Sequence, residues 1–173
     1  AFSTALLCRE HSPDQSEKVM AIAPIFAQKE RGQMRLLHTP QEISSLREHF
    51  PQTQSWQAQR AKVQPFKTAA HQHRIIHLAT HAAIDTLHQT PQIEFIDAPL
   101  YMPELYALNL QAHLVVLSAC KTGIGKLQKG EGAMSLARGF SYAGAKHLVA
   151  SLWNVNDGAT ANLFNHFYQE LSQ

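Results

Sequence analysis

The sequence lacks several features that would assign it to a specialised class of protein. It contains only two cysteines, Cys8 and Cys120, which lie too far apart to form a disulfide framework and are expected to be free thiols in a reducing compartment. No apolar run approaches the ~20 residues that a membrane-spanning helix needs. The N-terminus also lacks the order of a secretory signal. These absences predict a cytoplasmic protein that does not enter a membrane.

Charge is sparse as well. Charged residues make up 16% of the chain, and 15 Lys and Arg against 13 Asp and Glu leave a net charge of +2. So small an excess cannot form the basic surface that binds nucleic acid directly. The 173 residues, 45% of them hydrophobic, suffice for one substantial core without disulfides or metal. We therefore predict a single domain spanning residues 1–173.

Short apolar runs alternate with helical patterns along the chain. Buried strands are predicted at residues 19–26, 74–80, 113–119 and 147–153, with a short strand near residues 55–56. Helices are predicted at residues 39–50, 58–70, 103–109 and 133–140, with a last helix beginning at residue 156 or 157. The alternation predicts an α/β fold with a mostly parallel central sheet and helices on both faces.

Several residues mark the limits and faces of these helices. Thr39 begins a capping box with proline at the first helical position, Pro65 either kinks or restarts its helix, and Gly144 can end a helix in the left-handed conformation. The residues of the last helix expected to face the core are Leu163, Phe167 and Leu171, with Phe164 and Tyr168 beside them.

Two of the predicted strands end in residues that can carry chemistry. The run 74–80 is followed by His81 and the run 113–119 by Cys120, and a crossover helix makes the strands parallel, so both ends meet at one sheet edge. A thiol within reach of an imidazole is a nucleophile with its general base. The backbone N–H groups of Cys120 and Ala82 would lie near the developing oxyanion. This layout indicates amide hydrolysis, whereas each residue taken alone would more often have a structural role.

Four histidines that lie close together in the sequence, His71, His73, His77 and His81, raise the alternative of a metal site. His77 and His81 have the i, i+4 spacing of zinc ligands on a helix. On a strand, however, that spacing separates the two imidazoles by ~13 Å, which is too far for one ion. We therefore predict a site with no metal and no cofactor.

Four motifs follow the order and spacing of the CHAT domain of the caspase-like cysteine peptidases. They are HLATH at residues 77–81, LVVLSACKTG at 114–123, GEG at 130–132 and SLWNVND at 151–157. The chain thus resembles this family most clearly over roughly its last hundred residues. The resemblance implies a caspase-like three-layer α/β sandwich that cleaves peptide bonds in protein substrates. It makes His81 the base and Cys120 the nucleophile.

The resemblance also implies partners. Such domains commonly follow helical-repeat regions and are often switched on by a partner. The chain opens at Ala1 without an initiator Met, so we expect a fragment of a longer protein that lacks the family's last helix and strand. The family usually has glycine where this chain has Ala82, which would be strained by ~1 kcal/mol if the position needs positive φ. A catalytically weak or inactive CHAT signalling module is therefore the alternative to an endopeptidase.

Three further residues are candidates for substrate binding. Ser118 stands two positions before Cys120, where related peptidases selective for basic residues carry a carboxylate, so a pocket for Arg or Lys is not supported. Trp153 can line the cleft, although an aromatic residue at a strand end more often belongs to the core. Asp157 can provide charge to the cleft or cap the last helix.

Overall fold

The computed structural model of the chain describes residues 18–27, 36, 39–85, 87, 90–118, 131–150 and 157–173, with the side chains of 131–133 and 157–161 left aside. The strands are β1 (Val19–Ala23), β2 (Gln54–Gln57), β3 (Ile75–Leu78), β4 (Ala82–Ile84), β5 (Pro91–Glu94), β6 (Pro99–Tyr101), β7 (Leu114–Leu117) and β8 (His147–Ala150). The α-helices are α1 (Thr39–His49), α2 (Val63–Ala69), α3 (Met102–Tyr106), α4 (Glu131–Tyr142) and α5 (Asp157–Leu171). Two short 3-10 helices are η3 (Ala58–Arg60) and η4 (Ala70–Gln72).

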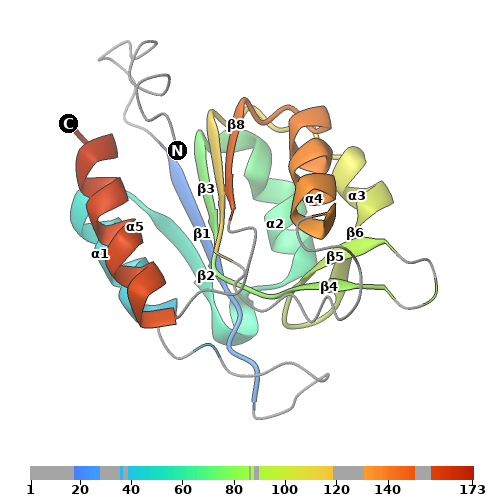
Figure 1. Ribbon diagram of the computed structural model, residues 1–173, viewed down its shortest axis with the longest axis horizontal. Coiled ribbons are helices and arrows are strands. Elements are labelled where there is room, and N and C mark those ends of the chain that lie inside the picture. Colours follow the sequence, from blue (N-terminus) through green and yellow to red (C-terminus); the bar gives the residue numbers. More distant parts are fainter. Residues whose placement is uncertain are drawn as a thin grey trace.

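A five-stranded parallel sheet with the order β2-β1-β3-β7-β8 forms the middle of the molecule. Helices α1 and α5 cover one face, and α2, α3 and α4 lie on the other (Figure 1). The predicted three-layer α/β sandwich is therefore confirmed. The predicted βαβ relation is also confirmed, because β3 and β7 are parallel neighbours.

Burial on both faces explains why the strands read as continuous apolar runs. In β3, Ile76 and Leu78 belong to the core beneath α2, α3 and α4, whereas Ile75 belongs to the core beneath α1 and α5. The same alternation holds for Val115 and Val116 in β7. A strand covered on both sides needs apolar residues at successive positions, which removes the usual alternation of polar and apolar residues.

The chain between β3 and β7 holds more than the predicted crossover helix. Strands β4, β5 and β6 form a separate antiparallel sheet in the order β4-β5-β6. Helix α3 covers residues 102–106 rather than 103–109. The second sheet buries Ile93 and Leu100 in the same core as α3. Its strands of three or four residues are too short for a periodic pattern to reveal them.

The structure tests the two backbone predictions made at Pro65 and Gly144. Pro65 is the third residue of α2, after a break that follows η3, so it restarts the helix in the first turn, where a missing N–H costs least. Gly144 has φ of 109° and closes α4, with Ala145 N–H donating to Phe140 O at 2.9 Å. An added Cβ at Gly144 would lie 2.2 Å from the carbonyl oxygen of Leu110, so this position excludes a side chain.

The predicted core face of the last helix was wrong at one residue. Leu163 is 65% exposed, while Phe164 and Tyr168 are buried against α1 and the sheet. Phe167 and Leu171 are partly buried, as partners of that cluster. A helix on the outside of a sandwich buries one stripe, and on α5 the stripe runs through Phe164 and Tyr168 at i, i+4 spacing. Leu163 lies one residue off that stripe.

Candidate active site

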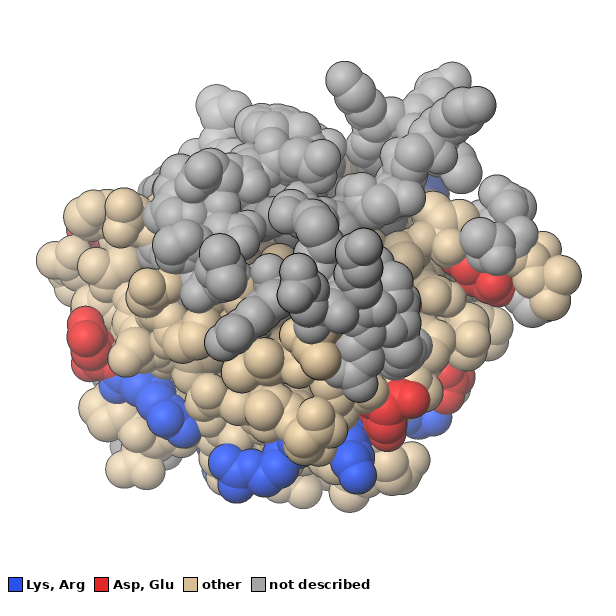
Figure 2. All heavy atoms as spheres, turned by 90° about the horizontal axis from the view of Figure 1, so that it is seen from below, with Lys and Arg blue, Asp and Glu red and all other residues tan. Residues whose placement is uncertain are grey.

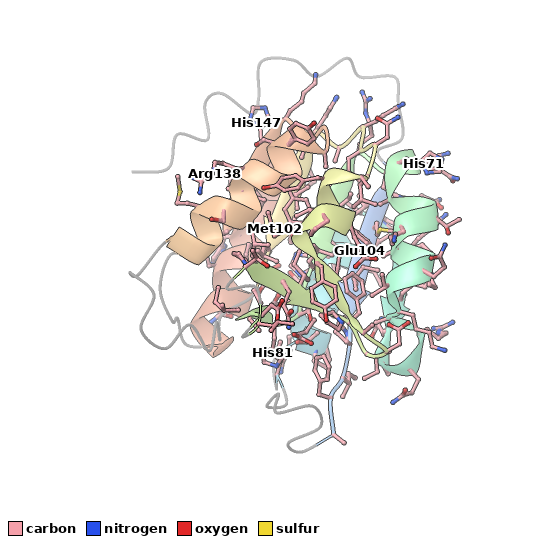
Figure 3. The ribbon with its side chains drawn as sticks, turned by 90° about the vertical axis from the view of Figure 1, so that its right-hand side faces the viewer. His71, His81, Met102, Glu104, Arg138 and His147 are labelled. Carbon is pink, nitrogen blue, oxygen red and sulfur yellow. The ribbon has the colours of Figure 1, made fainter. Side chains whose placement is uncertain are left out.

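His81 lies just beyond the carboxyl end of β3, where the sequence places the base (Figure 3). Its residue surface is 1% exposed. The imidazole packs against the ring of Phe26, with 5.5 Å between ring centroids and 46° between ring planes. Phe26 follows β1 in the chain, so the ends of the neighbouring strands β1 and β3 meet at this histidine.

Backbone hydrogen bonds to β5 fix the segment around His81. The N–H of Glu94 donates to His81 O at 2.8 Å, and the hydroxyl of Thr80 donates to the carbonyl oxygen of Glu94. Strand β4 begins at the next residue, Ala82. His81 therefore stands at the junction of the parallel sheet and the antiparallel sheet, with its main chain held from β5.

The register of β4 on β5 sets the direction of the Ala82 N–H group. Ala82 is opposite Ile93, while hydrogen bonds join His81 to Glu94 and Asp85 to Thr90. Hydrogen-bonded and non-hydrogen-bonded pairs alternate along an antiparallel ladder, so the Ala82–Ile93 pair is a non-hydrogen-bonded one. The Ala82 N–H therefore points away from β5, toward the open side of the edge strand β4. Of the non-glycine residues that the structure describes, only Ala58 has positive φ, so Ala82 carries no strain of that kind.

Of the other predicted site residues, the structure fully describes only Ser118. It follows β7, is 5% exposed, and donates its N–H to Leu78 O at 2.9 Å, so it lies at the same sheet edge as His81. Cys120 and Trp153 lie outside the described residues. Asp157 is the first residue of α5, and its side chain also lies outside them.

Glu94 is a buried acid beside this edge that the sequence pattern did not single out. Its residue surface is 2% exposed, and Oε1 accepts a hydrogen bond from Gln92 Nε2 at 2.7 Å. The sequence feature that could have pointed to Glu94 is its position between two apolar residues, Ile93 and Phe95. Both of these neighbours are fully buried in the structure. A charged residue inside a buried strand is uncommon, because removing it from water is costly.

His77 belongs to a separate polar network on the α1 and α5 side of β3. Its Nε2 lies 3.2 Å from Glu42 Oε2, and its Nδ1 lies 2.7 Å from the hydroxyl of Tyr168. A carboxylate can only accept, so Nε2 donates to Glu42, and in the neutral imidazole the phenol donates to Nδ1. Complete burial, together with the nearby charge of Glu42, raises the pKa of Tyr168 well above its usual range, which keeps the phenol neutral.

The other histidines of the sequence cluster are dispersed. His73 is at the opposite end of β3, where Nδ1 donates to Ala69 O at 2.8 Å, and burial lowers its pKa. His71 and His81 lie at opposite ends of the molecule in Figure 3. Within the described ranges, no group of three or more His, Cys, Asp or Glu residues could hold a metal ion.

Charged side chains of both signs are visible in Figure 2. In this view from below, Lys and Arg side chains lie along the lower edge, with Asp and Glu side chains to the left and right of them. This mixture agrees with the small net charge of +2. In the part of the chain described, no helix has the length and apolar character needed to cross a membrane.

The fold and the comparisons with known proteins define the class. Counted along the parallel sheet alone, the strand order is 2-1-3-4-5, that of flavodoxin-like doubly wound proteins. The chain is similar in fold to a flavodoxin from Streptococcus pneumoniae TIGR4, with a TM-score of 0.51 and 13% identity over 90% of this chain and 97% of that chain. The CHAT domain model matches residues 1–173. The chain therefore belongs to the CHAT domain family, a caspase-like peptidase family. No curated protein matches it.

Proposed function

We propose that the chain is a cysteine endopeptidase that hydrolyses peptide bonds in protein substrates through His81 and Cys120. The observation that carries the proposal is the position of His81, buried at the carboxyl edge beside the end of β7. Cys120 follows Ser118 by two residues, and chain connectivity keeps their Cα atoms within ~7 Å. In an open α/β sheet, this edge is where ligands bind.

The proposed reaction has two steps. His81 takes the proton of the Cys120 thiol, and the sulfur attacks the peptide carbonyl carbon. The C–N bond then breaks as His81 passes the proton to the leaving amine, which leaves a thioester on Cys120. Water, deprotonated by His81, attacks the thioester, and the carboxylic acid product departs as the thiol is restored.

The backbone beside His81 supports a role in stabilising the oxyanion. The Ala82 N–H points to the open side of β4, and we propose that it binds the oxyanion together with the Cys120 N–H. Because Ala82 does not have positive φ, one of the reasons for expecting an inactive module falls away. Ser118, Trp153 and Asp157 are proposed to contact substrate, and a partner or an attached helical-repeat region to activate the domain.

The test measures cleavage of a peptide library by wild type and variants. The protein used is the longest natural one that contains this chain, together with any partner that it has. We expect Cys120→Ala and His81→Ala each to lose cleavage by about a thousandfold or more. Cys8→Ala and the exposed His166→Ala serve as matched controls that keep it. A thiol-directed electrophile should label the wild type at residue 120. Equal cleavage by wild type and Cys120→Ala would overturn the proposal.

A further inference from the structure

The register of the antiparallel sheet brings Glu94 directly opposite His81. Ala82 pairs with Ile93, and the preceding pair is joined by the 2.8 Å bond from Glu94 N–H to His81 O. Residues opposite each other in such a pair project to the same face, with Cβ atoms about 5 Å apart. Ala82 and Ile93 project to the other face, where both are buried in the core. The carboxylate and the imidazole therefore share one face of the β4–β5 ribbon.

The surroundings of Glu94 hold its carboxylate in place. The residue is 2% exposed, and Gln92, two residues earlier on the same face of β5, donates to Oε1 at 2.7 Å. Burying a carboxylate costs several kcal/mol unless a charge or hydrogen bonds offset it. Only one of its direct cross-strand neighbours in this register can become a cation, and that neighbour is His81.

We propose that Glu94 is a positioning residue for His81: its carboxylate orients the imidazole and stabilises the imidazolium that forms when Cys120 gives up its proton. This inference rests on the proposed function. It adds a third member to the dyad, in the role that an acid plays beside the base of a catalytic triad. The carboxylate itself does not take the proton.

The other groups around His81 leave Glu94 as the one described acid opposite it. Phe26, from the segment after β1, and Ser118, after β7, carry no charge. Asp85 is the next acid on the same face of the β4 segment, four residues away and thus about 13 Å along the strand. Its Oδ1 accepts a hydrogen bond from Leu87 N–H. Asp85 therefore offers a matched control.

The direct test is an NMR titration of His81, measured in a Cys120→Ala background so that the thiol does not contribute. We expect Glu94→Gln to lower the pKa of His81 by about one pH unit or more, since an adjacent anion favours the imidazolium. Glu94→Asp keeps the charge and should retain most of that effect, and Asp85→Asn should leave the titration unchanged. A Glu94→Gln titration within ~0.2 pH unit of the parent, in a folded protein, would overturn the inference.

Kinetics supply a second readout in the protein with Cys120 intact. Glu94→Gln should lower kcat/KM about 10- to 100-fold with little change in KM, and the limb of the pH profile set by His81 should move to lower pH. A loss confined to KM for substrates with Arg or Lys at the cleaved bond would instead place Glu94 in a substrate pocket and overturn the inference.

The two readouts separate the two claims. If cleavage needs Cys120 but the pKa of His81 does not change in Glu94→Gln, the positioning role of Glu94 is overturned. The proposed endopeptidase function then still stands. A titration that depends on Glu94 in a protein without Cys120-dependent cleavage supports the electrostatic pairing and overturns the proposed function.

Discussion

Three buried histidines along β3 and its flanks differ in what surrounds them. His73, His77 and His81 are spaced four residues apart, with exposed fractions of 2%, 0% and 1%. The first binds a backbone carbonyl at the amino end of the sheet, and the second bridges α1 and α5 inside the sandwich. The third stands at the carboxyl edge, opposite Glu94.

Burial alone therefore does not assign a histidine to structure or to chemistry. His77 has partners from two helices that must pack for the fold to form, so its loss should appear as lost stability. His81 lies where the parallel strands end and a second sheet begins, so its loss should appear as lost activity.

Replacing His77 should produce the largest loss of stability. His77→Ala removes a ring packed against Phe164 and leaves the Glu42 carboxylate and the Tyr168 hydroxyl buried without their shared partner. We expect a cost of about 3–5 kcal/mol in the free energy of unfolding, measured by urea denaturation. The control His166→Ala, on the exposed side of α5, should change it by less than about 0.5 kcal/mol. A loss below 1 kcal/mol at His77 would remove the structural role assigned to this network.

Removing one hydroxyl from the same network should cost less. Tyr168→Phe keeps the ring but leaves His77 Nδ1 without the donor that lies 2.7 Å away. We expect a loss of about 1–3 kcal/mol, because an acceptor buried without a hydrogen bond keeps its desolvation cost. Tyr106→Phe, at a residue 43% exposed, is the matched control and should be nearly neutral. Equal denaturation midpoints for the two variants would contradict the prediction.

His73 should make stability fall in acid. Burial lowers its pKa below 6.5, and the charges of Lys18 and His71 act in the same direction, against the hydrogen bond to Ala69. The unfolded chain therefore binds the proton more readily. The stabilisation that comes from a neutral His73 in the folded state is complete above about pH 6.5. As pH falls toward the pKa of His73 in the folded state, the free energy of unfolding drops by at most ~1.4 kcal/mol per pH unit. Denaturation midpoints between pH 7 and pH 5 should show this slope, and His73→Asn, which keeps a donor for Ala69 O, should lack it.

The smallest effects concern two alanines with opposite backbone conformations. Ala82 lies in β4, so Ala82→Gly should lower stability by about 0.5–1 kcal/mol. Ala58 has φ of 50°, so Ala58→Gly should raise stability by up to about 1 kcal/mol. Thermal unfolding of both variants tests the contrast. Stabilisation by Ala82→Gly would show that the site beside His81 prefers the conformation of the family's glycine.

Much of the fold was predictable because its strands are buried on both faces. Continuous apolar runs located β1, β3 and β7, and the capping box at Thr39 located the start of α1. The position of His81 followed from where a run ends. The second sheet escaped prediction because its strands are brief, and Leu163 was misplaced because two adjacent helical stripes carry large apolar residues.

The candidate site was only partly predictable for a related reason. Glu94 becomes significant through the strand register that places it opposite His81, thirteen residues earlier in the chain, which no local pattern encodes. Cys120 and Trp153 lie outside the described residues, so their roles stay predictions. The sequence thus locates the ends of strands, while cross-strand neighbours need the structure.

The most direct test of the account is the reactivity of Cys120 toward iodoacetamide between pH 5 and pH 9, measured on its peptide by mass spectrometry. If His81 activates the thiol, Cys120 of the wild type should react at pH 6 at least about tenfold faster than Cys120 of His81→Ala. Two profiles that coincide and rise together near the free-thiol pKa of ~8.5 would contradict the His81–Cys120 pair.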